Sequence, residues 1–268
     1  MADYSYLMKG IQKIETDSSV LVSSSRYLND PRVRDWVSTH LLRKNGADIP
    51  TPSDSAQLIV MLRDLQDIDH INALISEERA KNPELDAWFK DRFVSTFEAE
   101  DLKDYAPDTV GGIFYAELMG KGMSVNIVPP YEPDSDYEYF QLRAGQVHDF
   151  EHIIGGGGFD FIGELVPYYM RLTNLFVHMS PELASELSVF SILASTRVLT
   201  RAVLHYPQTW LLTHNATLRG SEVGRNSAPL YFMKYEDVFD MTIKDARKAL
   251  GVHGVEMVDT GPASAQWV

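Results

Sequence analysis

The sequence has 268 residues, of which 44% are hydrophobic and 23% are charged, a composition typical of a globular protein with a substantial core. Its formal net charge of −14 repels the phosphate backbone of nucleic acids, so we expect no nucleic-acid partner. Cysteine is absent, which excludes disulfides, thiolate metal sites and a cysteine nucleophile.

The N-terminal segment, residues 1–19, has no long apolar core and carries early acidic residues, unlike a signal or transit peptide. No uncharged apolar run approaches the roughly 18 residues expected of a membrane span. We therefore expect a bacterial cytoplasmic protein. Peripheral attachment to the inner membrane stays open as an alternative.

Start and stop signals of helices recur along the chain, whereas the alternating pattern of strands is scarce. A polar cap residue followed by proline is typical of a helix start, and glycine after the last apolar residue is typical of an end. The predicted starts are Asp30-Pro31, Asn82-Pro83-Glu84, Ser180-Pro181-Glu182 and the capping box of Thr242 with Asp245, and the predicted stops are Asn45-Gly46 and Leu250-Gly251.

Apolar residues follow helical spacing in residues 56–65, 110–119, 137–154 and 183–204. The proline-containing stretch 121–136 is predicted to be a loop. No repeat or low-complexity linker divides the chain. These patterns predict an all-α fold, a single globular multi-helix domain over residues 1–268.

The C-terminal residues 253–268 are predicted to form a mobile tail beyond a core of about residues 25–252. The last ten residues are small and polar apart from Trp267, which leaves an alternative in which the tail docks through that side chain.

The strongest candidate site is a pair of histidines, His148 and His152, in the apolar segment 137–154. Residues four apart on a helix share one face, which is the spacing that a metal ion requires. The run Gly155 to Gly158 predicts a helix end near Ile154 and a sharp turn. A second helix is predicted from Phe161, with Asp160 as its N-cap, so that Glu164 points back at the histidines.

Asp149 directly follows His148, and neighbours on a helix do not face the same way. It either reaches the metal from the edge or orients a histidine. Imidazole nitrogen and carboxylate oxygen ligands suit Zn, Fe, Mn or Co better than Ca. A coordination position that the protein leaves free for water or substrate is typical of a catalytic metal. The alternative is a chance pair of surface or hydrogen-bonded core histidines.

Two groups of side chains near this motif are ambiguous in the sequence. An apolar and aromatic band fits either core packing or the wall of a lipid channel. The arginines of this region fit either surface ion pairs or contacts to a substrate carboxylate or phosphate. The band is Phe159, Phe161, Leu165, Tyr168, Tyr169, Leu172, Leu175 and Phe176, and the arginines are Arg143, Arg171, Arg197 and Arg201.

The motif reads His148-Asp149-x-x-His152, followed by eleven residues and then Glu164. This motif resembles the signature of the Coq-four family of ubiquinone (coenzyme Q) biosynthesis proteins. An ordered series of further similar segments extends the resemblance over about residues 25–252 and makes it more specific than one motif. These segments are Asn82-Pro83-Glu84-Leu85, Thr109-Val110-Gly111-Gly112-Ile113-Phe114-Tyr115, Gly220, Gly224, Pro229-Leu230, Tyr235-Glu236-Asp237 and Asp245-Ala246-Arg247-Lys248-Ala249-Leu250-Gly251.

The resemblance implies an α-helical fold with an apolar channel for a polyprenyl chain and a divalent metal held by His148, Asp149, His152 and Glu164. It implies oxidative decarboxylation and hydroxylation of the aromatic head group of a polyprenylated phenol or quinone precursor. On this basis Asp149 and Glu164 are the expected catalytic residues. Expected partners are the precursor, other quinone-biosynthesis enzymes, a membrane surface and a second copy of the chain in a homodimer.

One alternative function is a polyprenyl-lipid carrier or scaffold that organises quinone-biosynthesis enzymes and keeps the metal for structure. A metallohydrolase is a weaker alternative, because Asp149 stands where zinc peptidases have a glutamate as general base.

Overall fold

The computed structural model describes residues 23–42, 53–122 and 128–267. Within these ranges the regular elements are helices, and the one β-type contact is an isolated bridge between Thr109 and Thr242. The predicted all-α fold and single domain are confirmed. The N-terminal segment and the predicted stop at Asn45-Gly46 lie outside the described residues.

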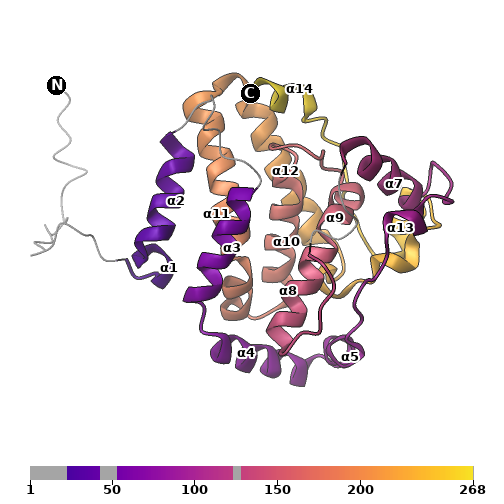
Figure 1. The fold of residues 1–268 in the computed structure, drawn as a ribbon, viewed down its shortest axis with the longest axis horizontal. Helices are drawn as coiled ribbons and strands as arrows, with labels where there is room; N and C mark the ends of the chain where they lie inside the picture. The colour runs from indigo at the N-terminus through magenta and orange to yellow at the C-terminus, as the bar shows by residue number, and fades with distance from the viewer. Residues whose placement is uncertain (1–22, 43–52, 123–127, 268) are drawn as a thin grey trace, which may run out of the picture.

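The long helices form the centre of the molecule, and shorter helices lie around them (Figure 1). The α-helices are α1 (Arg26–Asn29), α2 (Pro31–Leu42), α3 (Ser53–Leu65), α4 (Ile68–Lys81), α5 (Pro83–Asp91), α6 (Ala99–Leu102), α7 (Val110–Lys121), α8 (Asp136–Gln146), α9 (His148–Gly155), α10 (Leu165–His178), α11 (Pro181–His205), α12 (Trp210–Asn226), α13 (Ile243–Ala249) and α14 (Gly261–Ser264). Short 3-10 turns are η1 (Pro207–Thr209), η2 (Leu230–Phe232), η3 (Tyr235–Val238) and η4 (Ala265–Trp267).

The predicted helix starts coincide with α2, α5, α11 and α13. In α2, α5 and α13 the cap side chain accepts from backbone N–H groups, whereas Ser180 of α11 forms no such hydrogen bond and that helix begins with Pro181. The Asn82 side chain accepts hydrogen bonds from the N–H groups of Glu84 and Leu85, both at 3.1 Å. The Thr242 hydroxyl accepts from the Asp245 N–H at 3.2 Å and donates to its carboxylate at 2.8 Å.

The helices α10, α11 and α12 stand side by side, with α2 and α3 beside α11 and with α9 between α10 and α7 (Figure 1). Two glycines let α12 approach α10 closely: a Cβ atom on Gly220 would lie 2.5 Å from the Val166 carbonyl oxygen, and one on Gly224 would lie 2.3 Å from that of Met170. No larger residue fits at either position without moving a helix.

The helix α11 is long and apolar enough to cross a membrane by length and composition, a test that the core helix of a soluble protein also passes. Half of its apolar window is buried inside the molecule, where α11 packs on α10, α12, α2, α3 and α4. This packing accounts for the apolar side chains on that half of the window.

The predicted single helix over residues 137–154 is wrong, because the structure has two helices that meet at Val147. Gly145 is a poor helix former and lies against Val128, where a Cβ atom would come within 2.4 Å of the Val128 side chain. The break redirects α9 so that Phe150 packs on Phe114 of α7, with ring centroids 4.2 Å apart. Burial of such an aromatic side chain contributes about 1.5–3 kcal/mol, which favours the redirected helix.

The C-terminal tail is docked, which is the second of the two alternatives for this segment. Trp267 is 4% exposed and stacks on Tyr206 with ring centroids 5.1 Å apart. The Tyr206 hydroxyl donates to the Trp267 carbonyl oxygen at 3.0 Å, and the indole N–H donates to the Thr209 hydroxyl at 3.3 Å.

Candidate metal site

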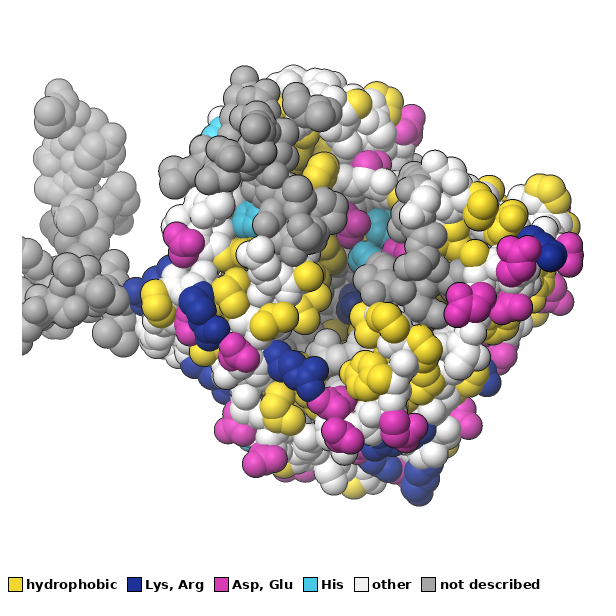
Figure 2. Space-filling view, in the orientation of Figure 1, with side chains coloured by type: hydrophobic (Ala, Val, Ile, Leu, Met, Phe, Trp, Pro, Cys, Tyr) yellow, Lys and Arg dark blue, Asp and Glu magenta, His cyan; other side chains and the backbone are white. Residues whose placement is uncertain are grey.

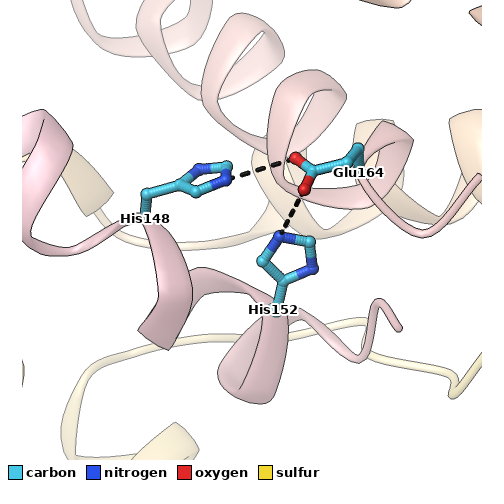
Figure 3. A group of neighbouring side chains, drawn as sticks. All are labelled: His148, His152 and Glu164. Carbon is cyan, nitrogen blue, oxygen red and sulfur yellow. Dashed lines mark ion pairs between the residues drawn. The ribbon is translucent and has the colours of Figure 1, made fainter. Parts of the chain in front are cut away.

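The two histidines of the motif lie one helical turn apart on α9, and Glu164 faces both of them (Figure 3). His148 Nε2 lies 3.2 Å from one carboxylate oxygen of Glu164, and His152 Nε2 lies 3.5 Å from the other. One potential ligand atom from each of the three residues lies within 4.8 Å of the others. The structure thus brings together three of the four predicted ligands in a group that could hold a metal ion.

The glycine run ends α9 and turns the chain back toward the histidines, as predicted. Gly156 has a φ of +82°, a conformation that favours glycine, and its N–H donates to the His152 carbonyl oxygen at 2.9 Å. The returning chain crosses at very short range, because a Cβ atom on Gly163 would lie 2.0 Å from the Gly158 carbonyl oxygen. This close crossing places Glu164 opposite α9.

The predicted helix start at Phe161 is wrong, since α10 begins at Leu165 and Glu164 is its N-cap. Pro167 has no N–H to donate to Gly163, so it favours a helix start immediately before it. Asp160 caps the preceding turn instead, where its side chain accepts from the N–H groups of Ile162 at 3.1 Å and Gly163 at 3.0 Å.

Residues from the C-terminal segment hold this turn in place. The second carboxylate oxygen of Asp160 accepts from the Thr260 hydroxyl at 2.6 Å, and the Ser264 hydroxyl donates to the first oxygen. The Asp160 carbonyl oxygen in turn accepts from the Glu164 N–H at 3.0 Å. A hydrogen-bonded path therefore runs from the tail through Asp160 to Glu164.

The cluster is buried at His152 and partly exposed at His148 and Glu164. His152 has a side-chain exposure of 1%, whereas those of His148 and Glu164 are 19% and 26%. Two of the three potential ligands are therefore in contact with solvent.

Opposite charges within the cluster determine its protonation. Burial by itself raises the pKa of Glu164, but His152 and His148 outweigh it and hold the pKa well below its ordinary value. Burial lowers the pKa of His148, yet the Glu164 carboxylate reverses the effect and raises it. In the metal-free protein these charges favour an ionised Glu164 beside a protonated His148.

Asp149 is buried on α9 at 4% exposure and does not belong to the group of three ligand atoms. Its Oδ2 has no hydrogen-bond partner among the described residues, and the same holds for His152 Nδ1. Burial raises the pKa of Asp149, and the charges of His148 and His152 oppose the rise. The role of Asp149 as ligand or as orienting base stays a prediction.

These features fit a divalent metal. Two imidazole nitrogens and a carboxylate converge, a second carboxylate is buried next to them, and polar atoms stay without partners. A buried polar atom without a hydrogen bond is costly, so such atoms indicate a group that the protein alone does not provide.

An ion pair that the sequence interpretation missed lies behind His148. The Glu151 side chain is 2% exposed, and Arg171 of α10 binds both of its oxygens, at 2.5 and 3.2 Å. Glu151 Oε2 lies 3.9 Å from His148 Nδ1, on the side of the ring away from Glu164. Its spacing of three residues from His148 on α9 is a signal that could have predicted this carboxylate.

The four arginines of the motif region differ in their surroundings. Arg143 is 1% exposed and forms a bidentate ion pair with Glu236, with both distances at 3.0 Å. Arg171 is paired with Glu151, and Arg201 is buried and donates to the His40 carbonyl oxygen at 3.2 Å. Arg197 is buried as well. A surface ion pair is therefore the wrong interpretation for Arg143, Arg197 and Arg201.

The apolar band after the glycine turn contributes to the core. Leu165, Tyr168 and Leu175 are buried, whereas Phe176 is 47% exposed. Phe159 stacks on His152 with ring centroids 4.7 Å apart. Most of the band thus packs inside the domain, and a channel for a lipid tail stays a prediction.

Comparisons with known proteins agree with this architecture. The family model described as "Coenzyme Q (ubiquinone) biosynthesis protein Coq4" matches residues 90–256, which is more than half of the chain. A crystal structure of a Nostoc punctiforme protein, named provisionally as a ubiquinone biosynthesis protein, has the same fold with a TM-score of 0.62 at 19% identity. The similarity covers 85% of this chain and 99% of that one. No curated protein sequence matches.

Proposed function

The chain belongs to the Coq4 family of coenzyme Q (ubiquinone) biosynthesis proteins, and from this premise we propose that it is a metal-dependent enzyme acting on the aromatic head group of a polyprenylated quinone precursor. The proposed reaction is oxidative decarboxylation with hydroxylation at the same ring carbon. The observation that supports it is the convergence of His148, His152 and Glu164 in one cluster that is partly exposed at His148 and Glu164.

In this reaction the bond between the ring and its carboxylate breaks, carbon dioxide leaves, and a carbon–oxygen bond forms at the vacated carbon. Dioxygen is the oxidant, its second oxygen atom leaves as water, and an external two-electron donor balances the electrons. A bound divalent metal of the Zn, Fe, Mn or Co class would supply a Lewis acid for the negative charge that develops on the ring.

The protein residues have separate roles in this proposal. His148, His152 and Glu164 hold the metal, and the Glu151–Arg171 ion pair fixes the orientation of His148 from behind. The buried Asp149 would accept a proton at Oδ2, an atom without a hydrogen-bond partner among the described residues. Phe159, stacked on His152, keeps water from that side of the site.

The test compares metal content and turnover in the wild type and in His152→Ala. We expect about one metal ion per chain in the wild type, release of carbon dioxide from carboxylated polyprenyl phenols under oxygen, and loss of both in the variant without unfolding. The control is His253→Asn, because His253 is exposed and far in sequence from the motif. A wild type that takes up no metal under any loading condition would overturn the proposal.

A second candidate is a carrier or scaffold for polyprenyl lipids and other enzymes of quinone biosynthesis, with a structural metal. Exposed apolar side chains where α11 passes into α12 favour it: Val203 at 50%, Leu204 at 61% and Leu211 at 81% exposure. Such a surface suits a protein partner, a second copy of the chain or a membrane. A scaffold keeps its complexes in the folded His152→Ala variant, whereas the enzyme loses turnover there.

A further inference from the structure

Arg197 on α11 differs from the other three arginines of the region because it lacks a hydrogen-bonded partner. It is 7% exposed, and it forms no hydrogen bond or ion pair with any residue that the structure describes. It forms a cation–π contact with Trp36 of α2, whose ring centroid lies 5.8 Å from the guanidinium carbon. An aromatic face attracts a cation, but it offers no conventional hydrogen-bond acceptor to the N–H groups of the guanidinium.

A second cation lies one helical turn away on the same helix. Arg201 is 6% exposed, and burial lowers its pKa, with the charge of Arg197 adding to the effect. Two buried like charges at this spacing repel each other. An anion beside Arg197 would offset this repulsion.

Arg197 also lies on the side of α11 that faces the metal site. Tyr168 is one turn after Glu164 on α10, and its ring stacks on His148 with centroids 6.1 Å apart. The Tyr168 ring also contacts Phe190 of α11 edge to face, with centroids 5.9 Å apart. Arg197 follows Phe190 by seven residues, about two helical turns along the same face of α11. Tyr168 therefore lies between the cluster and the face of α11 that carries Arg197.

The face of the molecule in Figure 2 is hollowed. Histidine, acidic and basic side chains are visible in the hollow, and hydrophobic side chains lie along part of its edge (Figure 2). Such a surface suits a ligand with an apolar body and an acidic group.

We propose that Arg197 binds an anionic oxygen group, a carboxylate or a phosphate, of the ligand whose head group occupies the metal site. A guanidinium offers paired N–H donors that match two oxygens of either group. The inference rests on the proposed function for the place of the head group. It also selects one arginine of the four for ligand binding.

The test measures binding without turnover. Isothermal titration of the metal-loaded protein compares 4-hydroxybenzoate with phenol, and geranyl monophosphate with geraniol. In the wild type we expect the anionic member of at least one pair to bind tenfold or more tightly than the neutral member, and the pair that shows this identifies the anion. In Arg197→Gln we expect this preference to vanish while affinity for the neutral probe and the metal content stay unchanged.

Two further variants separate binding from structure. Arg197→Lys keeps the charge without the paired donors and is expected to recover part of the preference. Arg225→Gln, at an exposed position of α12, is the control and keeps all of it. Equal binding of both members of each pair in the wild type would overturn the inference, as would equal losses for charged and neutral probes in Arg197→Gln. Because the readout is affinity, it can succeed even if the decarboxylation is absent.

Discussion

Asp160 links the C-terminal tail to the residue that completes the metal cluster, and its removal gives a demanding test of this structure. Its carboxylate accepts from two backbone N–H groups and two hydroxyls, those of Ile162, Gly163, Thr260 and Ser264. Asp160→Ala removes all four hydrogen bonds at once. Hydrogen bonds to a charged group contribute about 1.5–3 kcal/mol each, but bonds that share one carboxylate are not additive.

We therefore expect the free energy of unfolding to fall by about 3–5 kcal/mol in Asp160→Ala. The turn that carries Glu164 also loses its anchor, so metal affinity is expected to fall by roughly 10–100-fold. Asp160→Asn keeps one acceptor oxygen, and the hydroxyls of Thr260 and Ser264 can rotate to accept from its amide, so its losses should be smaller.

Urea denaturation and metal titration measure the two effects in the same preparations. Asp259→Ala is the matched control, because Asp259 is exposed and its side chain accepts one hydrogen bond, from the Gly261 N–H at 3.3 Å. Wild-type metal affinity in Asp160→Ala would show that the tail does not position Glu164.

Two further predictions concern the cluster and the turn. In the metal-free protein the lowered pKa of Glu164 stabilises the fold above about pH 4.3 and the raised pKa of His148 stabilises it below about pH 6.5, so their joint contribution is greatest between these values. Urea midpoints across pH 3–9 should show the loss on both sides, and a profile that His148→Asn leaves unchanged would refute the assignment. Gly163→Ala is expected to destabilise the protein by more than about 3 kcal/mol, since its Cβ atom would lie 2.0 Å from the Gly158 carbonyl oxygen. Gly120→Ala on α7 meets no atom within 4 Å and should be neutral or stabilising by up to about 1 kcal/mol, so equal effects of the two changes would contradict the close crossing.

Local chemistry explains which parts of this protein the sequence determines by itself. A cap acts within three or four residues, so Asn82 and Thr242 predict their helix starts correctly. The spacing of His148 and His152 and the following glycines likewise need only helix geometry and backbone freedom to predict a cluster with Glu164.

The tertiary structure decided the features that depend on residues far apart in the chain. The tail supplies Thr260 and Ser264 to Asp160 from about a hundred positions away, and the break at Val147 depends on packing between α9 and α7. Four similar arginines were equivalent in the sequence, and only their neighbours in space distinguish them. Burial and partners are properties of the assembled core, because each depends on which distant side chains arrive at the same place.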